Sequence, residues 1–293
     1  MTHPPVQALK GTRILSLALN LPGPAALMRC HTMGGECTKV EPPAPPGMIS
    51  GDPMGMYCAR AYEQLHTGIR VLRANLKTAE GQALLAQELA HTDVLITSFR
   101  PSALAKFGLS WEALHAHYPR LSLVRIVGAP GAAAEEPGHD LTYLAQAGLV
   151  ADTDLPPTLF ADMGGALMAS EAVLQVLLER AHTHQGSCVE VALSDAADWL
   201  ALPRTWKLTT TDGDVGGAHA FYRVYPCVDG RVACAALEPH FAARVLQLLE
   251  LSPQSDPHQK SVHEAMAVWM RQKTRAELDT LGREHDIPLY TMA

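Results

Sequence analysis

The sequence lacks a basic segment, a long apolar run and an export signal. Only 18% of its 293 residues are charged, and the formal net charge is −7. A nucleic-acid-binding protein needs a basic patch, which no run of Lys or Arg provides here. The uncharged stretch 14–28 is interrupted by Pro22 and Pro24 and falls short of the ~18–20 apolar residues of a membrane span. The first ten residues hold two prolines and no apolar core, so we expect no signal peptide. We therefore expect neither a nucleic acid nor a membrane as partner.

Metal and nucleotide motifs are absent as well. The six cysteines include no pair with C-x2-C spacing, and we expect them to be reduced thiols of a cytoplasmic protein. The closest histidines, His182 and His184, lie in a segment typical of a loop, so no metal site is predicted. No G-x-G-x-x-G follows the first apolar run, and neither a Walker A loop nor a G-x-S-x-G elbow occurs. A nicotinamide site therefore has no support in the sequence.

Short apolar runs alternate with helical patterns through the first two thirds of the chain. Residues 13–19 predict a buried strand, residues 25–32 a helix and residues 37–40 a second strand. Strand, helix and strand in this order form a βαβ unit, which favours a parallel sheet. Further strands are predicted at 93–97, 121–127 and 188–193, and helices at 79–90, after Ser110 and after Asp162. We interpret residues 1–194 as a doubly wound, Rossmann-like α/β domain.

The pattern changes after residue 194. Residues 195–217 have no strong period and are interpreted as a linker with some helix. Two apolar runs, 222–228 and 231–236, flank Asp229 and Gly230, which predicts a β-hairpin. A helix is expected after Pro239, and Thr274 with Glu277 forms a capping box that opens another. Residues 218–293 are thus predicted to form a smaller α+β domain.

Several short motifs in a fixed order resemble the class III CoA-transferase superfamily (CaiB/BaiF type). They are Pro22-Gly23-Pro24, Asp93-Val94-Leu95-Ile96 with Phe99-Arg100-Pro101, Phe107-Gly108-Leu109, Gly138-His139-Asp140-Leu141-Thr142-Tyr143, Ala161-Asp162, Gly216-Gly217 before Phe221-Tyr222, and Glu238-Pro239. The resemblance runs along nearly the whole chain and depends on the order and number of these pieces. The His139-Asp140 dipeptide favours the α-methylacyl-CoA racemase branch, since plain transferases share only the acid matched by Asp162.

The resemblance implies which residues act on an acyl-CoA thioester. It matches His139 and Asp162 to the two acid/base residues of the racemases, and Asp140 and Glu238 to acids that support the site. It also implies binding residues: Ala74, Asn75, Leu76 and Lys77 lining the CoA site, Arg100 near the CoA phosphates, and Gly138, Leu141, Thr142 and Tyr143 along the pantetheine and thioester. No cofactor is required, because coenzyme A is part of the substrate. The family fold is an interlocked homodimer, which would place Glu238 against the partner's His139.

Racemisation at C2 of a 2-methylacyl thioester suits these residue types. One group removes the C2 proton, and an opposed group delivers a proton to the other face of the planar enolate. An imidazole changes charge near neutral pH and burial raises the pKa of a carboxyl group, so a neutral His and a protonated acid fit the task. The amides of residues 162–165 are candidates for holding the enolate oxygen, because a helix N-terminus favours negative charge.

Each residue also has a plain structural interpretation. His139 and Asp140 are equally explained as an ion pair in a loop, Asp162 as an N-cap and Glu238 as an acid in the first turn of a helix. Arg100 and Lys77 fit solvated surface charges. The family's methionine-rich acyl surface matches Met163 and Met168, but Met at helical spacing is more often core.

Three functions stay open on this evidence. The first is an acyl-CoA racemase or epimerase. The second is a CoA-transferase in which Asp162 attacks the thioester and forms an acyl-aspartyl anhydride. The third is a non-catalytic acyl-CoA-binding protein that has kept the fold. His139 separates the first two, because racemisation uses it and transfer does not need it.

The sequence departs from the family pattern in three places. Lys39 stands where the family has an arginine after the second strand, so we expect either that Lys39 replaces it or that the adenosine phosphates bind more weakly. The loop between His139 and Asp162 is shorter than usual. The chain ends at Ala293, so the C-terminal segment that returns to the large domain is expected to be missing. A compact variant, a truncated chain and a degenerate paralogue all fit this.

Overall fold

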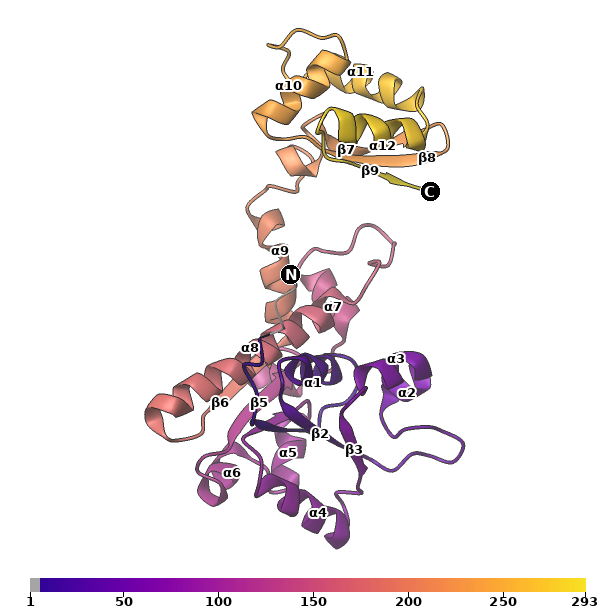
Figure 1. Cartoon of the computed structure of the whole chain (residues 1–293). Helices are drawn as coiled ribbons and strands as arrows, with labels where there is room; N and C mark the ends of the chain where they lie inside the picture. Colours follow the sequence, from indigo (N-terminus) through magenta and orange to yellow (C-terminus); the bar gives the residue numbers. More distant parts are fainter. Residues whose placement is uncertain (1–5) are drawn as a thin grey trace. The chain divides into compact units, whose positions relative to one another are not determined.

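The computed structural model describes residues 6–293. Residues 1–5, part of the segment in which we expect no signal peptide, lie outside the described residues. The chain divides into two compact units, Met1–Ala201 and Leu202–Ala293 (Figure 1). The segment expected to be a linker, 195–217, spans this division and contains most of helix α9 (Leu193–Thr205) and the short helix η2 (Asp214–Gly216).

Unit 1 is built on a six-stranded parallel sheet. Its strands are β1 (Arg13–Ser16), β2 (Glu36–Glu41), β3 (Arg70–Arg73), β4 (Val94–Thr97), β5 (Ser122–Val127) and β6 (Cys188–Ala192). They lie in the order β3-β2-β1-β4-β5-β6, and every neighbouring pair is parallel. The chain winds outward from β1 in one direction and from β4 in the other, which is the doubly wound order. The predicted fold class is confirmed.

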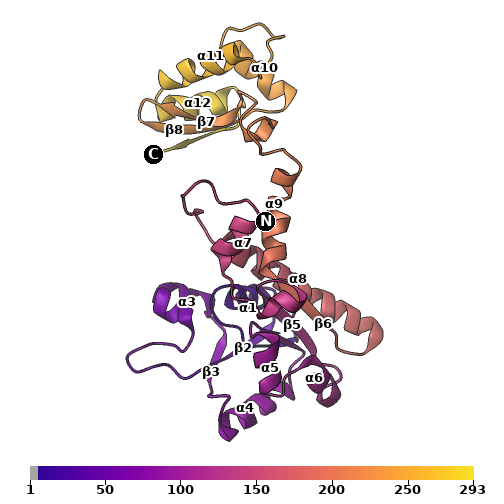
Figure 2. The same ribbon diagram turned by 180° about the vertical axis from the view of Figure 1, so that it is seen from behind.

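Helices cover both faces of this sheet (Figures 1 and 2). They are α1 (Pro22–Thr32), α2 (Pro53–Tyr57), α3 (Ala59–Leu65), α4 (Ala79–Leu89), α5 (Pro101–Lys106), α6 (Trp111–His117), η1 (Gly131–Glu135), α7 (Asp140–Gln146) and α8 (Phe160–Thr183). Alternate strand residues point to opposite faces. Ile14 and Ile96 therefore pack in one core with α1 and α8, whereas Leu15 and Leu95 pack in another with α4, α5 and α6.

Helix α8 is the longest element of the unit. By length and composition alone it would fit a membrane span. The side chains on its inner face, among them Ala166, Ala169 and Val173, are buried in the core with α1 and the sheet. Small residues along this face let the two helices approach closely, so the core of unit 1 accounts for the apolar character of α8.

Unit 2 combines an antiparallel sheet with three helices. The strands β7 (Tyr222–Cys227), β8 (Gly230–Ala235) and β9 (Leu289–Met292) lie in the order β7-β8-β9. The helices are α10 (Pro239–Leu248), α11 (Lys260–Arg271) and α12 (Arg275–Glu284). The predicted hairpin at Asp229 and Gly230 is confirmed. The capping box is confirmed too, since the Thr274 N–H donates to Glu277 and the Glu277 N–H donates to the Thr274 hydroxyl.

Candidate active site

A pocket opens at the carboxyl ends of the strands of unit 1. Its lining comes from the segments after β1, β4, β5 and β6 and from the starts of α7 and α8. The lining residues are Leu19, Asn20, Pro22, Ser98, Phe99, Arg100, Ile126, Val127, Gly128, Ala134, Glu136, Gly138, His139, Tyr143, Asp162 and Leu193. The order of strands reverses between β1 and β4. Because ligands of doubly wound sheets bind at such a switch point, the topology itself marks this pocket as a binding site.

The structure brings His139 and Asp162 into this one pocket. His139 is the residue before α7, and the Thr142 hydroxyl fixes its backbone by accepting from the His139 N–H at 3.1 Å and donating to its carbonyl at 2.7 Å. Asp162 is the third residue of α8, whose N-cap is Leu159, so capping does not explain this acid. Within residues 6–293 no ion pair joins His139 to Asp140. The ion pair expected for His139 and the N-cap expected for Asp162 therefore do not explain these two residues.

Asp140 holds the first turn of α8 in place. Its carboxyl group is buried, and Oδ1 accepts a hydrogen bond from the Asp162 backbone N–H at 2.9 Å. Burial of Asp162, and next the negative charge of Asp140, raise the pKa of the Asp162 side chain to about 7. A large fraction of Asp162 is therefore protonated at neutral pH, which is the state of a proton donor.

Tyr143 forms the floor beside these residues. It is buried, and burial followed by the charge of Asp162 raises its pKa above the ordinary value. A Cβ on Gly138 would lie 2.3 Å from the Tyr143 hydroxyl oxygen, and one on Gly128 would lie 2.1 Å from it. Both positions need glycine, because the space that a side chain would take is occupied by the Tyr143 hydroxyl at Gly128 and by the hydroxyl and the ring at Gly138.

Arg100 contributes a positive charge to the pocket. It follows β4 and directly precedes α5, and its side chain is exposed. An arginine at the carboxyl edge of the sheet suits an anionic group of a ligand, since the guanidinium stays charged at all physiological pH values. Its predicted contact with CoA phosphates stays a prediction.

Other predicted site residues lie away from the pocket. Ala74, Asn75, Leu76 and Lys77 follow β3, at the same edge of the sheet but two strands from β1. Leu141 and Thr142 are exposed residues of the first turn of α7. Glu238 belongs to unit 2, where it precedes α10. The roles implied for these residues stay predictions.

Lys39 requires a correction. The sequence suggests that it replaces an arginine at the CoA phosphates, yet its side chain is completely buried and forms ion pairs with Asp52 and Glu41. His66 is a further polar partner of the ammonium group. A phosphate reaching Lys39 would have to replace these contacts, so we no longer assign Lys39 to phosphate binding.

The expected oxyanion amides also require a correction. Helix α8 begins at Phe160, so Asp162 and Met163 lie within its first turns and not at its start. The Asp162 N–H donates to Asp140, and the Met163 N–H donates to the Leu159 carbonyl at 3.0 Å. These two amides already have partners and are not available to an enolate oxygen.

Sequence reasoning missed several residues of the pocket wall. Asn20 and Ser98 follow β1 and β4, and the Ser98 hydroxyl accepts from the Leu19 N–H at 3.1 Å. Asn20 has a left-handed backbone with φ of 65°, which a polar residue placed between an apolar run and a Pro-Gly-Pro turn could have signalled. Within residues 6–293, no group of three or more His, Cys, Asp or Glu side chains is arranged to hold a metal ion.

Comparisons with known proteins agree on one family. The family model described as CoA-transferase family III matches residues 9–292. Succinyl-CoA–D-citramalate CoA-transferase of Chloroflexus aurantiacus is 28% identical, over 98% of this chain and 79% of the relative. Alpha-methylacyl-CoA racemase of Mus musculus is 30% identical, over 86% of this chain and 68% of the relative.

A solved structure shares the fold. The crystal structure of a CAIB/BAIF family protein from Brucella suis gives a TM-score of 0.76 at 22% identity, covering 97% of this chain and 84% of that chain. Relatives that catalyse racemisation and relatives that transfer CoA are thus similar to this chain to nearly the same degree.

Proposed function

The chain belongs to CoA-transferase family III, and from this premise we propose that its pocket binds an acyl-CoA thioester and moves the proton at C2 of the acyl group. The pocket lies at the switch point of the sheet and holds His139, Asp162 and Arg100 together. Relatives named as racemases and as CoA-transferases both act on CoA thioesters. Within this shared substrate class we favour the racemase or epimerase reaction.

The presence of His139 and Asp162 in one pocket lining carries this choice, because racemisation needs two acid/base groups and transfer needs only the acid. The pKa of Asp162, about 7, leaves about half of it in the acid form at neutral pH, as a proton donor requires. In the proposed reaction the His139 imidazole takes the C2 proton, and the electron pair of the broken C–H bond forms the C1–C2 double bond of the enolate. The Asp162 carboxylic acid then donates its proton to the opposite face of C2, which restores the thioester with inverted configuration. The reverse reaction exchanges the two roles.

Transfer of CoA is the second candidate, and the transferase relatives favour it. Here the ionised Asp162 attacks the thioester carbonyl, the CoA thiolate leaves, and an acyl-aspartyl anhydride forms. An acceptor carboxylate then displaces the acyl group, and CoA is transferred to the acceptor acid. This reaction needs the anionic form of Asp162, and a pKa of about 7 leaves about half of the carboxyl groups in that form at neutral pH.

One experiment separates the two reactions. The protein is incubated in deuterated water with a 2-methylacyl-CoA and no acceptor acid, and deuterium at C2 is followed by NMR. We expect C2 exchange without acceptor. Acceptor-dependent CoA transfer without C2 exchange, with a hydroxylamine-trappable adduct at Asp162, would overturn the racemase proposal in favour of transfer. Tight acyl-CoA binding with neither activity would support a non-catalytic binding protein.

Three further expectations are part of the proposal. Coenzyme A enters only as part of the substrate, and no other cofactor is needed. A homodimer is expected from the family resemblance, with Glu238 supporting the partner's site, and the protein is expected in the cytoplasm. Light scattering of the purified protein tests the dimer directly.

A further inference from the structure

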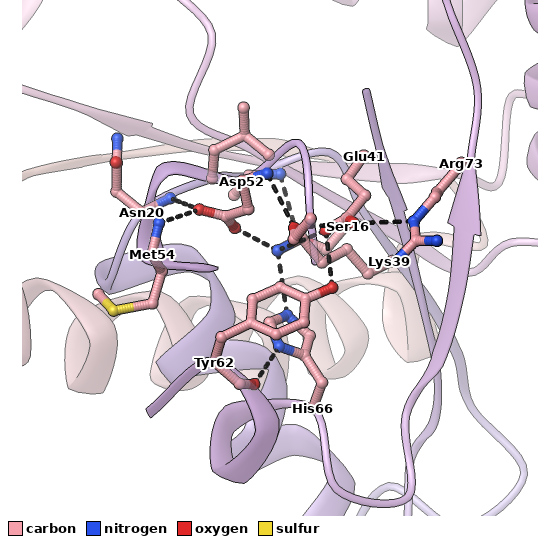
Figure 3. Close-up of polar contacts among 12 residues, drawn as sticks. Ser16, Asn20, Lys39, Glu41, Asp52, Met54, Tyr62, His66 and Arg73 are labelled. Carbon is pink, nitrogen blue, oxygen red and sulfur yellow. Dashed lines mark hydrogen bonds and ion pairs between the residues drawn. The ribbon is translucent and has the colours of Figure 1, made fainter. Parts of the chain in front are cut away.

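A buried charged cluster lies at the carboxyl end of β2 (Figure 3). We call Lys39, Glu41, Asp52, Tyr62 and His66 the Lys39 cluster. Glu41 and Asp52 form ion pairs with the Lys39 ammonium group, and all three side chains are completely buried. Buried charges are stable only when paired and hydrogen-bonded, so this group must be fixed in one arrangement.

The Lys39 ammonium group has three polar partners. Beside the two carboxylates, Nζ lies 3.0 Å from His66 Nε2. The other ring nitrogen, Nδ1, lies 2.6 Å from the Tyr62 carbonyl and must donate to it, so Nε2 is free to accept from Lys39. Burial, and next the charge of Lys39, lower the pKa of His66, which agrees with a neutral ring. Hydrogen bonds to Asp52 and His66, and an ion pair with Glu41 at 3.5 Å, thus hold the ammonium group.

The two carboxylates of the cluster have different second partners. Glu41 accepts from the Ser50 hydroxyl at 2.8 Å and the Tyr62 hydroxyl at 3.0 Å, and Arg73 at the rim lies 3.5 Å from it. The Ser50 hydroxyl also accepts from the Asp52 N–H at 2.9 Å, so Glu41 is linked to the backbone of Asp52 through Ser50 and does not contact Asn20. Asp52 instead uses Oδ1 to accept from two backbone N–H groups, those of Asn20 and Met54, each at 2.9 Å.

Asn20 belongs to the wall of the candidate active site. It follows β1, lines the pocket with His139 and Asp162, and its side chain extends away from Asp52 (Figure 3). Its φ of 65° is left-handed, a conformation that Asn adopts more readily than most residues with a side chain. The hydrogen bond to Asp52 is the contact that joins this turn to the Lys39 cluster.

We propose that Lys39 and Asp52 form a positioning pair that fixes the Asn20 turn as one wall of the acyl-CoA pocket. Lys39 fixes the orientation of the Asp52 carboxylate, and Asp52 in turn holds the Asn20 N–H. The inference is derived from the proposed function of that pocket. It assigns the buried lysine a role in shaping the site through Asp52 and Asn20, in place of the phosphate contact expected from the sequence.

Asp52→Ala and Glu41→Gln form a matched pair for the test. Both weaken the Lys39 cluster, but only Asp52→Ala removes the acceptor of the Asn20 N–H. Hydrogen exchange of the backbone amides of residues 17–22 is measured by NMR, together with the global stability of each variant. We expect the Asn20 amide to exchange at least tenfold faster in Asp52→Ala and to stay protected in Glu41→Gln. Asp52→Asn keeps a carbonyl acceptor and is expected to restore the protection.

Turnover gives the second measurement. A misplaced pocket wall costs about 10²-fold in rate, so we expect kcat for C2 exchange to fall about 10²-fold in Asp52→Ala, with little change in Glu41→Gln. CoA affinity from calorimetry should be kept in both variants. The amide measurement does not need turnover. An inactive wild-type protein would therefore count against the proposed function. The positioning proposal would still be tested by the hydrogen-exchange measurement.

Three results would overturn the positioning proposal. One is unchanged exchange of the Asn20 amide in Asp52→Ala. Another is equal loss of protection and rate in Asp52→Ala and Glu41→Gln, which would mean that the cluster contributes only global stability. The third is free exchange of the Asn20 amide in the wild-type protein. This measurement needs no variant, so it still tests the positioning proposal if Asp52→Ala fails to fold.

Discussion

The Asp140 carboxylate accepts the backbone N–H of Asp162 at 2.9 Å, so the acid that raises the pKa of Asp162 also fixes the turn on which Asp162 lies. Burial is the larger cause of the raised pKa, and Asp140 adds to it while also fixing the position of Asp162. A variant that keeps the hydrogen bond and removes the charge separates the two effects.

Asp140→Asn is that variant. Its side-chain carbonyl still accepts the Asp162 N–H, while the negative charge that raises the Asp162 pKa is lost. In the direction of turnover in which Asp162 donates its proton, the rate falls as pH rises through the Asp162 pKa. We expect this fall to move to lower pH in the variant, as measured from the pH dependence of kcat/KM. An unchanged profile would remove Asp140 from the tuning of Asp162.

Asp162→Asn is expected to change how stability depends on pH. The Asp162 pKa is raised from 3.8 to about 7, so the folded protein binds a proton that the unfolded chain releases between these values. Its contribution is fully present below about pH 4 and is lost as pH rises to about 7. Above that range the variant should be more stable than wild type by about 2 kcal/mol, a value reduced for partial exposure. Urea unfolding at pH 4.5 and pH 8 checks it, and a pH-independent difference would contradict it.

His139→Ala is expected to abolish C2 exchange and spare CoA binding. The imidazole is proposed to act on the C2 proton and not to hold the nucleotide, so loss of a general base should cost ~10²–10⁴ in rate. His117→Ala, which changes a histidine of α6 outside the pocket lining, is the matched control. Exchange is followed by NMR and binding by calorimetry. Near wild-type exchange in His139→Ala would exclude His139 from the mechanism.

Three glycine and tyrosine variants test the packing of the pocket floor. A Cβ on Gly128 meets the Tyr143 hydroxyl oxygen at 2.1 Å, and its next contact is at 3.2 Å. Gly128→Ala should therefore lower the free energy of unfolding by about 1–3 kcal/mol, and Tyr143→Phe should largely restore it.

Gly138→Ala is the comparison for that pair. Its Cβ would also lie 2.6 Å from the ring carbon Cζ, so removal of the hydroxyl leaves a clash. Tyr143→Phe should rescue Gly128→Ala better than Gly138→Ala. Equal rescue of both would contradict the geometry of the floor.

Coenzyme A is expected to bind without a metal ion or nicotinamide. The predicted basis is the pocket with Arg100 and the segment after β3. Calorimetry with acetyl-CoA and free CoA, after treatment with EDTA, measures this. The absence of heat and of competition at millimolar ligand would refute the claim.

The sequence predicted most of the elements and their layers. The apolar run 121–127 corresponds to β5, and the helical spacing after Asp162 corresponds to α8. Both could be recognised because apolar residues recur with different periods in a buried strand and in a helix that packs one face on the core. It missed β3 (Arg70–Arg73), an edge strand whose two ends are charged and whose middle is half-buried. Such a strand carries no apolar run.

The candidate site was predictable only where motifs carried it. His139, Asp162, Arg100, Gly138 and Tyr143 were expected and share the pocket lining. The burial of Lys39 was not predictable, because its partners come from positions 41, 52 and 66 and only the fold brings them together. The same holds for Asn20 and Asp52, which are 32 positions apart. Local sequence patterns do not predict contacts between side chains that are far apart in the chain.

The arrangement of strands also has a consequence for biosynthesis. The pocket draws residues from Leu19 to Leu193, and its central neighbours β1 and β4 are separated in the chain by β2, β3 and α4. Parallel pairing of distant strands is slow, since a large loop must close before the contacts form. On the ribosome, the lining of the pocket can be complete only after β6 and Leu193 have emerged. Ligand binding by a nascent chain should therefore report completion of the whole sheet.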